Sequence, residues 1–120
     1  MKTILIIDDE PEILQQVRKR LESHHYRCST AADPVAGIAS ARSEMPHLIL
    51  LDLMLPGMSG LGVLRELKKD PRLKTIPIVI LSAVGDEEIA REAMDLGAAG
   101  YLNKSCSPQE LLAAVREYAS

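Results

Sequence analysis

Polar residues that could do chemistry follow four of the five short apolar runs in this chain. They are Asp8, Asp9 and Glu10 after the first run, Asp52 after the third, Ser82 after the fourth and Lys104 after the fifth. If the runs are strands of one parallel sheet, these side chains meet at its carboxyl edge. Carboxylates a few ångströms apart repel by roughly 1 kcal/mol in water and about 4 kcal/mol at an effective dielectric constant of 20. Such a cluster needs a cation or carboxyl groups that retain protons.

Carboxylates, a hydroxyl and an ammonium group together suit phosphoryl transfer. Mg²⁺ prefers oxygen ligands and keeps several waters, which leaves it free to contact a phosphate. A carboxylate can attack phosphorus and form an aspartyl phosphate. Phosphoryl transfer depends mostly on positioning and on neutralisation of charge. Mg²⁺, Lys104 and the Ser82 hydroxyl would contact one phosphoryl oxygen each.

The five apolar runs predict five β-strands. Residues 4–7 and 78–81 are apolar at every position, which is typical of strands covered on both faces. The predicted strands are residues 3–7, 26–30, 48–51, 76–81 and 101–102.

Stretches with helical spacing lie between these runs. In the second of them we expect Val35, Ile38 and Ala39 to face the core. Five repeats of strand and helix predict an α/β fold, an open parallel sheet with helices on both faces. The predicted helices are about residues 11–21, 34–44, 61–69 and 87–96, and a fifth that opens with the capping box Ser107-Pro108-Gln109-Glu110.

Length and composition indicate one soluble globular domain. The chain has 120 residues, of which 47% are hydrophobic and 26% are charged, enough for a buried sheet with a polar surface. A net charge of −3 gives no basic face for direct nucleic-acid binding. The apolar runs are too short for a membrane span, and acids interrupt the first run before it could form a signal peptide. Cys28 and Cys106 make no disulfide framework, so we expect a cytoplasmic location.

Four segments of the sequence resemble the receiver domain of two-component response regulators, in the family's order and at family-like spacing. They are Ile6-Ile7-Asp8-Asp9-Glu10, Leu50-Leu51-Asp52-Leu53-Met54-Leu55-Pro56-Gly57-Met58-Ser59-Gly60, Ile80-Leu81-Ser82-Ala83 and Gly97-Ala98-Ala99-Gly100-Tyr101-Leu102-Asn103-Lys104. The resemblance implies one receiver domain over residues 1–120. It also implies a flavodoxin-like doubly wound (βα)5 fold, with five parallel strands in the order 2-1-3-4-5.

The resemblance implies roles for the acids. Asp52 would accept a phosphoryl group from a phosphohistidine of a sensor histidine kinase. Asp8, Asp9, Asp52 and the backbone carbonyl of Met54 would hold Mg²⁺. The domain would do chemistry only on itself, so we do not expect an enzyme with a separate substrate.

Ser82 and Lys104 would contact the phosphoryl group, and Tyr101 would be the switch aromatic. We expect Tyr101 to pack partly against the core, and to rotate inward when Ser82 is drawn toward the phosphoryl group. The face of the fourth helix, fifth strand and fifth helix would then change shape toward an output domain or a downstream target protein. The domain would be a monomer or a weak homodimer through this face.

One position departs from the family pattern. The lysine is usually followed by proline in a cis peptide, whereas Ser105 follows Lys104 here. A cis bond costs about 3–4 kcal/mol before a non-proline residue, against about 0.5–1 kcal/mol before proline. Either this bond is cis at that cost, or the loop runs trans and the position of Lys104 is open.

Other interpretations fit less well. A phosphatase of the haloacid-dehalogenase class needs a second acid two residues after its nucleophilic aspartate, and two residues after Asp52 this chain has Met54. A dinucleotide site needs a Gly-rich turn after the first strand, where acids stand. Taken alone, Asp8-Asp9 suits a helix cap and His24-His25 a solvated helix end. The runner-up is a phosphate-independent docking module, a pseudo-receiver, whose mark would be loss of a site residue.

Overall fold

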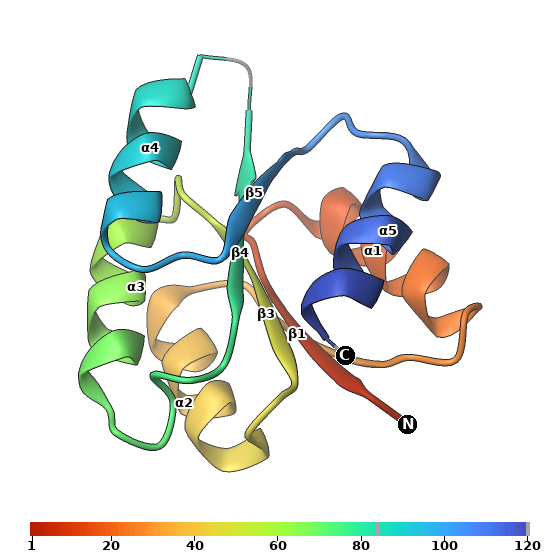
Figure 1. Cartoon of the computed structure of the whole chain (residues 1–120), viewed down its shortest axis with the longest axis horizontal. Helices are drawn as coiled ribbons and strands as arrows, with labels where there is room; N and C mark the ends of the chain where they lie inside the picture. Colours follow the sequence, from red (N-terminus) through yellow and green to blue (C-terminus); the bar gives the residue numbers. More distant parts are fainter. Residues whose placement is uncertain (84, 120) are drawn as a thin grey trace.

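Strands and helices alternate along the chain in the computed structural model, which describes residues 1–83 and 85–119 (Figure 1). In chain order they are β1 (Thr3–Ile7), α1 (Pro11–Glu22), β2 (Arg27–Ala31), α2 (Pro34–Glu44), β3 (Leu48–Asp52), α3 (Gly60–Lys69), β4 (Ile78–Ser82), α4 (Glu87–Asp95), β5 (Gly100–Asn103) and α5 (Pro108–Tyr118). The predicted alternation is confirmed. Asp52 and Ser82, predicted to follow their strands, are the last residues of β3 and β4.

The five strands form one parallel sheet in the order β2-β1-β3-β4-β5. Helices α1 and α5 lie on one face of the sheet, and α2, α3 and α4 on the other (Figure 1). This confirms the flavodoxin-like doubly wound fold and its strand order. Connections leave β1 and β3 in opposite directions, which opens a crevice at their carboxyl ends. Ile7 pairs with Leu51, so the next residues, Asp8 and Asp52, lie side by side at the carboxyl edge of the sheet.

Two aliphatic clusters make up the core, one on each face of the sheet. Leu5 and Ile7 of β1 belong to the cluster under α2, α3 and α4, while Ile4 and Ile6 belong to the cluster under α1 and α5. All four side chains are fully buried, and each contributes about 1.5–3 kcal/mol to folding. The continuous apolar run of β1 therefore reflects burial on both faces, as predicted.

The predicted inner face of α2 is wrong in part. Ile38 packs partly buried against the core as expected, but Val35 is 78% exposed and Ala39 is exposed. The residues that face inward are small. A Cβ added at Gly37 would lie 2.8 Å from Ile7 Cδ1, so α2 approaches β1 too closely for large side chains. The prediction for the inner face of α2 was wrong because it favoured large apolar residues, whereas the close approach to β1 favours small ones.

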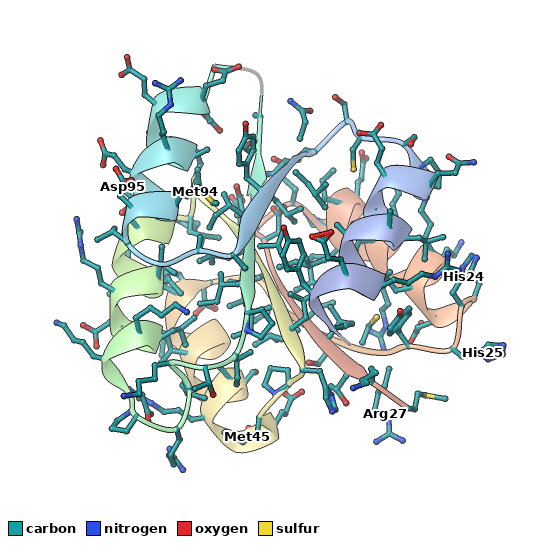
Figure 2. The ribbon with its side chains drawn as sticks, in the orientation of Figure 1. His24, His25, Arg27, Met45, Met94 and Asp95 are labelled. Atoms are coloured by element: carbon teal, nitrogen blue, oxygen red, sulfur yellow. The ribbon has the colours of Figure 1, made fainter. Side chains whose placement is uncertain are left out.

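The turn after α1 carries His24 and His25 outward into solvent (Figure 2). His24 Nδ1 lies 3.0 Å from the carbonyl oxygen of Arg20, at the end of the helix. The interpretation of this pair as a solvated helix end is confirmed. Among the described residues, no helix is both long and apolar enough to cross a bilayer.

Gly60, the first residue of α3, is where helix packing most directly constrains the site. A Cβ at Gly60 would lie 2.5 Å from the carbonyl oxygen of Asp52 and 2.5 Å from Leu53 Cα, both backbone atoms. We expect Gly60→Ala to lower the free energy of unfolding by about 1–3 kcal/mol, because the end of β3 must shift. Urea unfolding measures this change.

Gly62→Ala is the matched control on the same helix. The nearest atom to its new Cβ is Met58 Cγ at 2.7 Å, part of a flexible side chain. Alanine also favours helix over glycine by roughly 1 kcal/mol. Equal losses for Gly60→Ala and Gly62→Ala would show that the contact with β3 is unimportant.

Candidate functional site

Two carboxylates are buried at the neighbouring ends of β1 and β3. Asp8 is 0% exposed and Asp52 is 1% exposed. One oxygen of each accepts a backbone hydrogen bond: Asp8 Oδ1 from the Glu10 N–H at 2.9 Å, and Asp52 Oδ1 from the Met54 N–H at 3.2 Å. The other oxygens, Asp8 Oδ2 and Asp52 Oδ2, are buried and accept no hydrogen bond from the described residues. Such oxygens are costly unless a charge compensates them.

Lys104 brings its ammonium group between these carboxylates from the loop after β5. Its Nζ lies 3.2 Å from Asp8 Oδ2, 3.2 Å from Asp52 Oδ2 and 2.9 Å from Glu10 Oε1. The contact with Glu10 is a hydrogen bond. Those with the two Oδ2 atoms are ion pairs, and the ammonium group also donates a longer hydrogen bond of 3.5 Å to Asp8 Oδ1. Only 12% of the Lys104 side chain is exposed, so water screens these pairs weakly.

Burial shifts the titration of both partners. Burial raises the pKa of Asp52 from 3.8 to about 6; the Met54 N–H lowers it, the charge of Asp8 raises it and Lys104 lowers it. Burial also disfavours the charge on Lys104. Its hydrogen bond to Glu10 and the charges of Asp52 and Asp8 outweigh that effect and hold the pKa of Lys104 above its usual range. The site therefore keeps its ammonium charge and makes the Asp52 carboxylate a stronger base.

Asp8, Asp9 and Glu10 could hold a metal ion together. Their carboxylate oxygens lie within 4.8 Å of one another. Asp8 is buried, whereas Asp9 and Glu10 are exposed. Oxygen ligands suit Mg²⁺, and the two buried oxygens without hydrogen bonds, on Asp8 and Asp52, are the atoms that such an ion would compensate. The residues therefore fit a divalent cation. Met54, predicted to add its carbonyl, contributes its N–H to Asp52, and its side chain is exposed.

Ser82 ends β4, the strand beside β3, and Tyr101 lies one strand further on, in β5. The Ser82 hydroxyl donates to the carbonyl oxygen of Leu102 at 3.3 Å. Its own carbonyl accepts from the Lys104 N–H at 2.7 Å, which joins the ends of β4 and β5. Tyr101 is 59% exposed, so the expectation that it packs partly against the core is wrong for this conformation. β5 is an edge strand that pairs only with β4, and it leaves this side chain at the margin of the sheet.

The Lys104–Ser105 peptide is trans, since no cis peptide bond occurs in the described part of the chain. The sequence left cis and trans open, and the trans geometry still brings Lys104 Nζ to both buried carboxylates. The departure from the proline pattern therefore does not displace this side chain.

Comparison with known proteins agrees with this geometry. Residues 4–116 match the family model of the response regulator receiver domain. The chain belongs to this family. It is 41% identical over 115 residues to the phosphate regulon transcriptional regulatory protein PhoB of Pseudomonas aeruginosa, covering 96% of this chain and 50% of that protein. It is also 41% identical over 116 residues to the DNA-binding dual master transcriptional regulator RpaA of Synechocystis, covering 97% of this chain and 48% of that protein.

Solved structures show the same architecture over full-length matches. A putative response regulator from Chloroflexus aurantiacus superposes with a TM-score of 0.93 at 29% identity, covering 98% of this chain and 97% of the other. The Vibrio cholerae chemotaxis protein CheY4 superposes with a TM-score of 0.91 at 29% identity, covering 98% of each chain. The receiver thus spans about half the length of the curated relatives and nearly the whole of these two solved chains.

The sequence predicted that Asp8, Asp52 and Lys104 meet at one edge of the sheet, as they do, but it missed two contacts. Glu10 was counted among the acids and given no partner, whereas it makes the shortest of the three ion pairs of Lys104. The side chain of Asn103, which accepts from Ser105, was not singled out. Asparagine at the start of a turn is a known signal, and it was available here directly before Lys104.

Asp52→Asn should stabilise the metal-free receiver at neutral pH. The folded state raises the pKa of Asp52 from 3.8 to about 6. Between those values the unfolded chain releases a proton that the folded chain keeps, so this group makes stability fall as pH rises. Above about pH 6 the cost is roughly 3 kcal/mol, at 1.36 kcal/mol for each pH unit between the two pKa values. Asparagine removes it, so urea unfolding with chelator should show a gain of that order.

The gain should shrink toward zero as the pH falls below about 4, where Asp52 is protonated in both states. Asp33→Asn is the matched control, because it makes the same chemical change at an exposed acid outside the site and keeps a side-chain cap for α2. A loss of stability on Asp52→Asn at neutral pH would show that Lys104 outweighs burial.

Proposed function

We propose that this receiver takes a phosphoryl group onto Asp52 from a phosphohistidine of a sensor histidine kinase, and that the aspartyl phosphate switches a binding surface. The observation that carries the proposal is Asp52 Oδ2, a buried carboxylate oxygen with no hydrogen bond, 3.2 Å from Lys104 Nζ. It lies beside an acidic cluster suited to a divalent cation. A nucleophile, a fixed positive charge and a metal site together are what phosphoryl transfer needs.

The covalent step exchanges one bond to phosphorus for another. An Asp52 carboxylate oxygen attacks the phosphorus, an O–P bond forms and the P–N bond of the phosphohistidine breaks. The electron pair of the broken bond returns to the imidazole, which takes a proton from water. Lys104, already paired with Asp52, would follow the new negative charge onto a phosphoryl oxygen.

Asp8, Asp9, Asp52 and the backbone carbonyl of Met54 would hold Mg²⁺. When bound, this ion neutralises charge on the transferring phosphoryl oxygens. Asp8 supplies a buried ligand whose direction is fixed by the Glu10 N–H, and Asp9 supplies an exposed one. With four carboxylates and one ammonium group, Asp8, Asp9, Glu10, Asp52 and Lys104 carry an excess of negative charge that favours a divalent cation.

The switch would run through Ser82 and Tyr101. A phosphoryl oxygen on Asp52 offers the Ser82 hydroxyl a charged acceptor in place of the Leu102 carbonyl. Tyr101, beside Leu102 in β5, would then move from its exposed position inward. The phosphoryl group can only shift a balance between states that both exist beforehand. The face of α4, β5 and α5 would change its affinity for an output domain or a downstream target protein.

Several parts of this proposal come from relatives or from the sequence. The curated relatives are transcriptional regulators that this chain covers by about half, which favours an output domain as the partner. A monomer or a weak homodimer through α4, β5 and α5, a cytoplasmic location and the absence of direct nucleic-acid contact stay predictions. The pseudo-receiver alternative, whose support was the Ser105 departure, stays a prediction; the ion pairs of Lys104 with Asp8 and Asp52 support the phosphorylated receiver instead.

Incubation with Mg²⁺ and acetyl phosphate should add one phosphoryl group, measured by intact mass. The adduct should be absent with a chelator and absent in Asp52→Asn. Phosphorylation should also change the affinity for the output partner, because the switch has no effect without a difference between the two states. A full phosphoryl adduct on Asp52→Asn would show that another residue is the acceptor. No adduct on the wild type would favour the docking-module interpretation.

Mg²⁺ should raise the melting temperature of the receiver through the acidic cluster. A ligand at 100 times its Kd stabilises the folded state by about 2.7 kcal/mol. Asp9→Asn should abolish most of this rise, since Asp9 contributes an exposed ligand oxygen. Asp33→Asn, the same change outside the cluster, should keep the full rise. An unchanged rise in Asp9→Asn would place the ion elsewhere.

A further inference from the structure

We propose that Asn103 is a positioning residue for Lys104, and that its side-chain oxygen fixes the loop from which the ammonium group reaches Asp8 and Asp52. The inference rests on the proposed function, because it explains what holds the Lys104 ammonium group in the position from which it would neutralise the phosphoryl group. It adds a residue that does not touch the reacting atoms.

Asn103 closes the loop around Lys104 with three hydrogen bonds. Its Oδ1 accepts from the Ser105 N–H at 2.9 Å and from the Ser105 hydroxyl at 2.6 Å. Its backbone carbonyl accepts from the Cys106 N–H at 2.9 Å. Lys104 is therefore the second residue of a four-residue turn. Asn103, the first residue, accepts hydrogen bonds from the third and fourth residues, Ser105 and Cys106. The bond from the Ser105 hydroxyl is short, at 2.6 Å.

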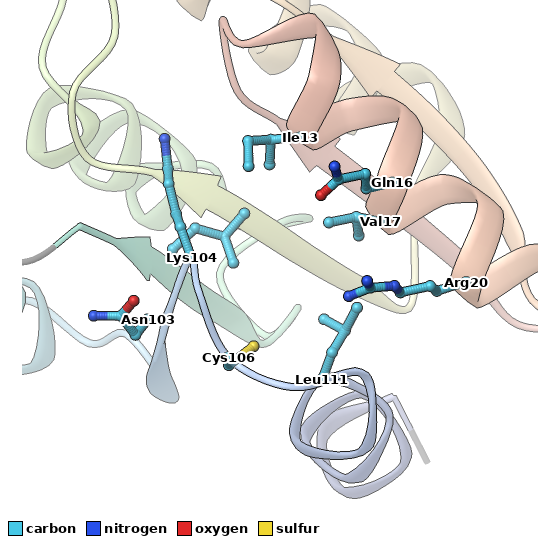
Figure 3. A pocket seen from close by; sticks show the side chains of 9 residues that line it. Ile13, Gln16, Val17, Arg20, Asn103, Lys104, Cys106 and Leu111 are labelled. Atoms are coloured by element: carbon cyan, nitrogen blue, oxygen red, sulfur yellow. The ribbon is translucent and has the colours of Figure 1, made fainter.

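The turn is anchored at two residues. Within it, the Lys104 N–H donates to the Ser82 carbonyl at 2.7 Å, which ties the loop to the end of β4. At its end, Cys106 packs partly buried against the cluster under α1 and α5. Figure 3 shows Cys106 and Leu111 on one side of a small cavity, with Val17 of α1 across it. The cavity holds about 30 Å³, close to the volume of one water.

Lys104 needs this support because its side chain is long and its target is narrow. A lysine side chain carries about 2 kcal/mol of rotamer entropy, and Nζ must stay within ion-pair distance of Asp8, Asp52 and Glu10 at once. Ser105 has no ring to restrict the backbone after Lys104. The Asn103 oxygen supplies the restriction instead. Without it, the Ser105 N–H and hydroxyl lose their partner and the loop gains conformations in which Nζ leaves the buried carboxylates for exposed Glu10.

A double-mutant cycle on the phosphorylation rate separates positioning from general stability. Asn103→Ala should slow phosphorylation by acetyl phosphate about fivefold or more, since misplacing a catalytic group by about 1 Å can cost as much as 100-fold. In a Lys104→Ala background the same substitution should slow it less than about twofold, because the group it positions is gone. Asn103→Asp keeps a side-chain acceptor and should restore most of the rate. Equal slowing in both backgrounds would overturn the inference.

Ser107→Ala is the matched structural control. Ser107 caps α5 just beyond the loop, where its side chain accepts from the Glu110 N–H, and it makes no recorded contact with Lys104. This variant should lower the melting temperature while leaving the phosphorylation rate unchanged. A rate loss equal to that of Asn103→Ala would mean that loop stability alone sets the rate, and would also overturn the inference.

A second cycle tests the positioning without any phosphorylation. Urea unfolding of wild type, Lys104→Met, Asp52→Asn and the double variant gives the coupling between Lys104 and Asp52. Repeating the cycle with Asn103→Ala should reduce this coupling by about half or more. Unchanged coupling overturns the inference even if the wild type is phosphorylated. If the wild type takes no phosphoryl group but Asn103→Ala still reduces the coupling, the inference stands and the proposed function is refuted.

Discussion

The burial of two neighbouring carboxylates is the constraint on which this structure depends. Asp8 and Asp52 lie side by side at the ends of adjacent strands because Ile7 pairs with Leu51. Each binds a backbone N–H through one oxygen, and each directs the other oxygen toward Lys104. One ammonium group cannot neutralise two buried carboxylates and Glu10 together, and burial, with a smaller contribution from the charge of Asp8, leaves the pKa of Asp52 raised. Three carboxylates against one ammonium group therefore leave the site with an excess of negative charge.

The rest of the fold supports this unfavourable arrangement. Residues 4–7 of β1 and 48–51 of β3 are apolar and buried on both faces of the sheet, so the acids sit at the end of a rigid sheet. Helix α3 begins at Gly60 directly against the backbone of Asp52 and Leu53, which leaves the end of β3 little room to relax. A destabilised site on a stable frame is the usual trade between stability and function. A cation bound here would relieve the repulsion, whereas the proposed phosphoryl group would add negative charge at Asp52 and draw Lys104 toward it.

The sequence predicted the strands and the site edge because both follow from simple regularities. Buried parallel strands need apolar residues at every position, and the polar residues that follow these strands lie together at the carboxyl edge of the sheet. Strand order came from the family resemblance, since apolar runs do not encode which strands are neighbours. The inner face of α2 was missed because closeness to Ile7 selects small residues such as Gly37. The pairing of Glu10 with Lys104 depends on a side-chain conformation that no spacing specifies.

Ser82 links the acidic cluster to the exposed face through two hydrogen bonds, whose typical free energies are known. Its carbonyl holds the Lys104 N–H, and its hydroxyl holds the Leu102 carbonyl, next to Tyr101. In the proposed switch the hydroxyl exchanges the Leu102 carbonyl for a phosphoryl oxygen. A neutral hydrogen bond contributes about 0.5–1.5 kcal/mol, and one to a charged group about 1.5–3 kcal/mol. The difference, about 1–2 kcal/mol, corresponds to a population shift of roughly 5- to 30-fold between the two arrangements of β5. That is enough to change a partner's occupancy and small enough for both arrangements to exist before phosphorylation.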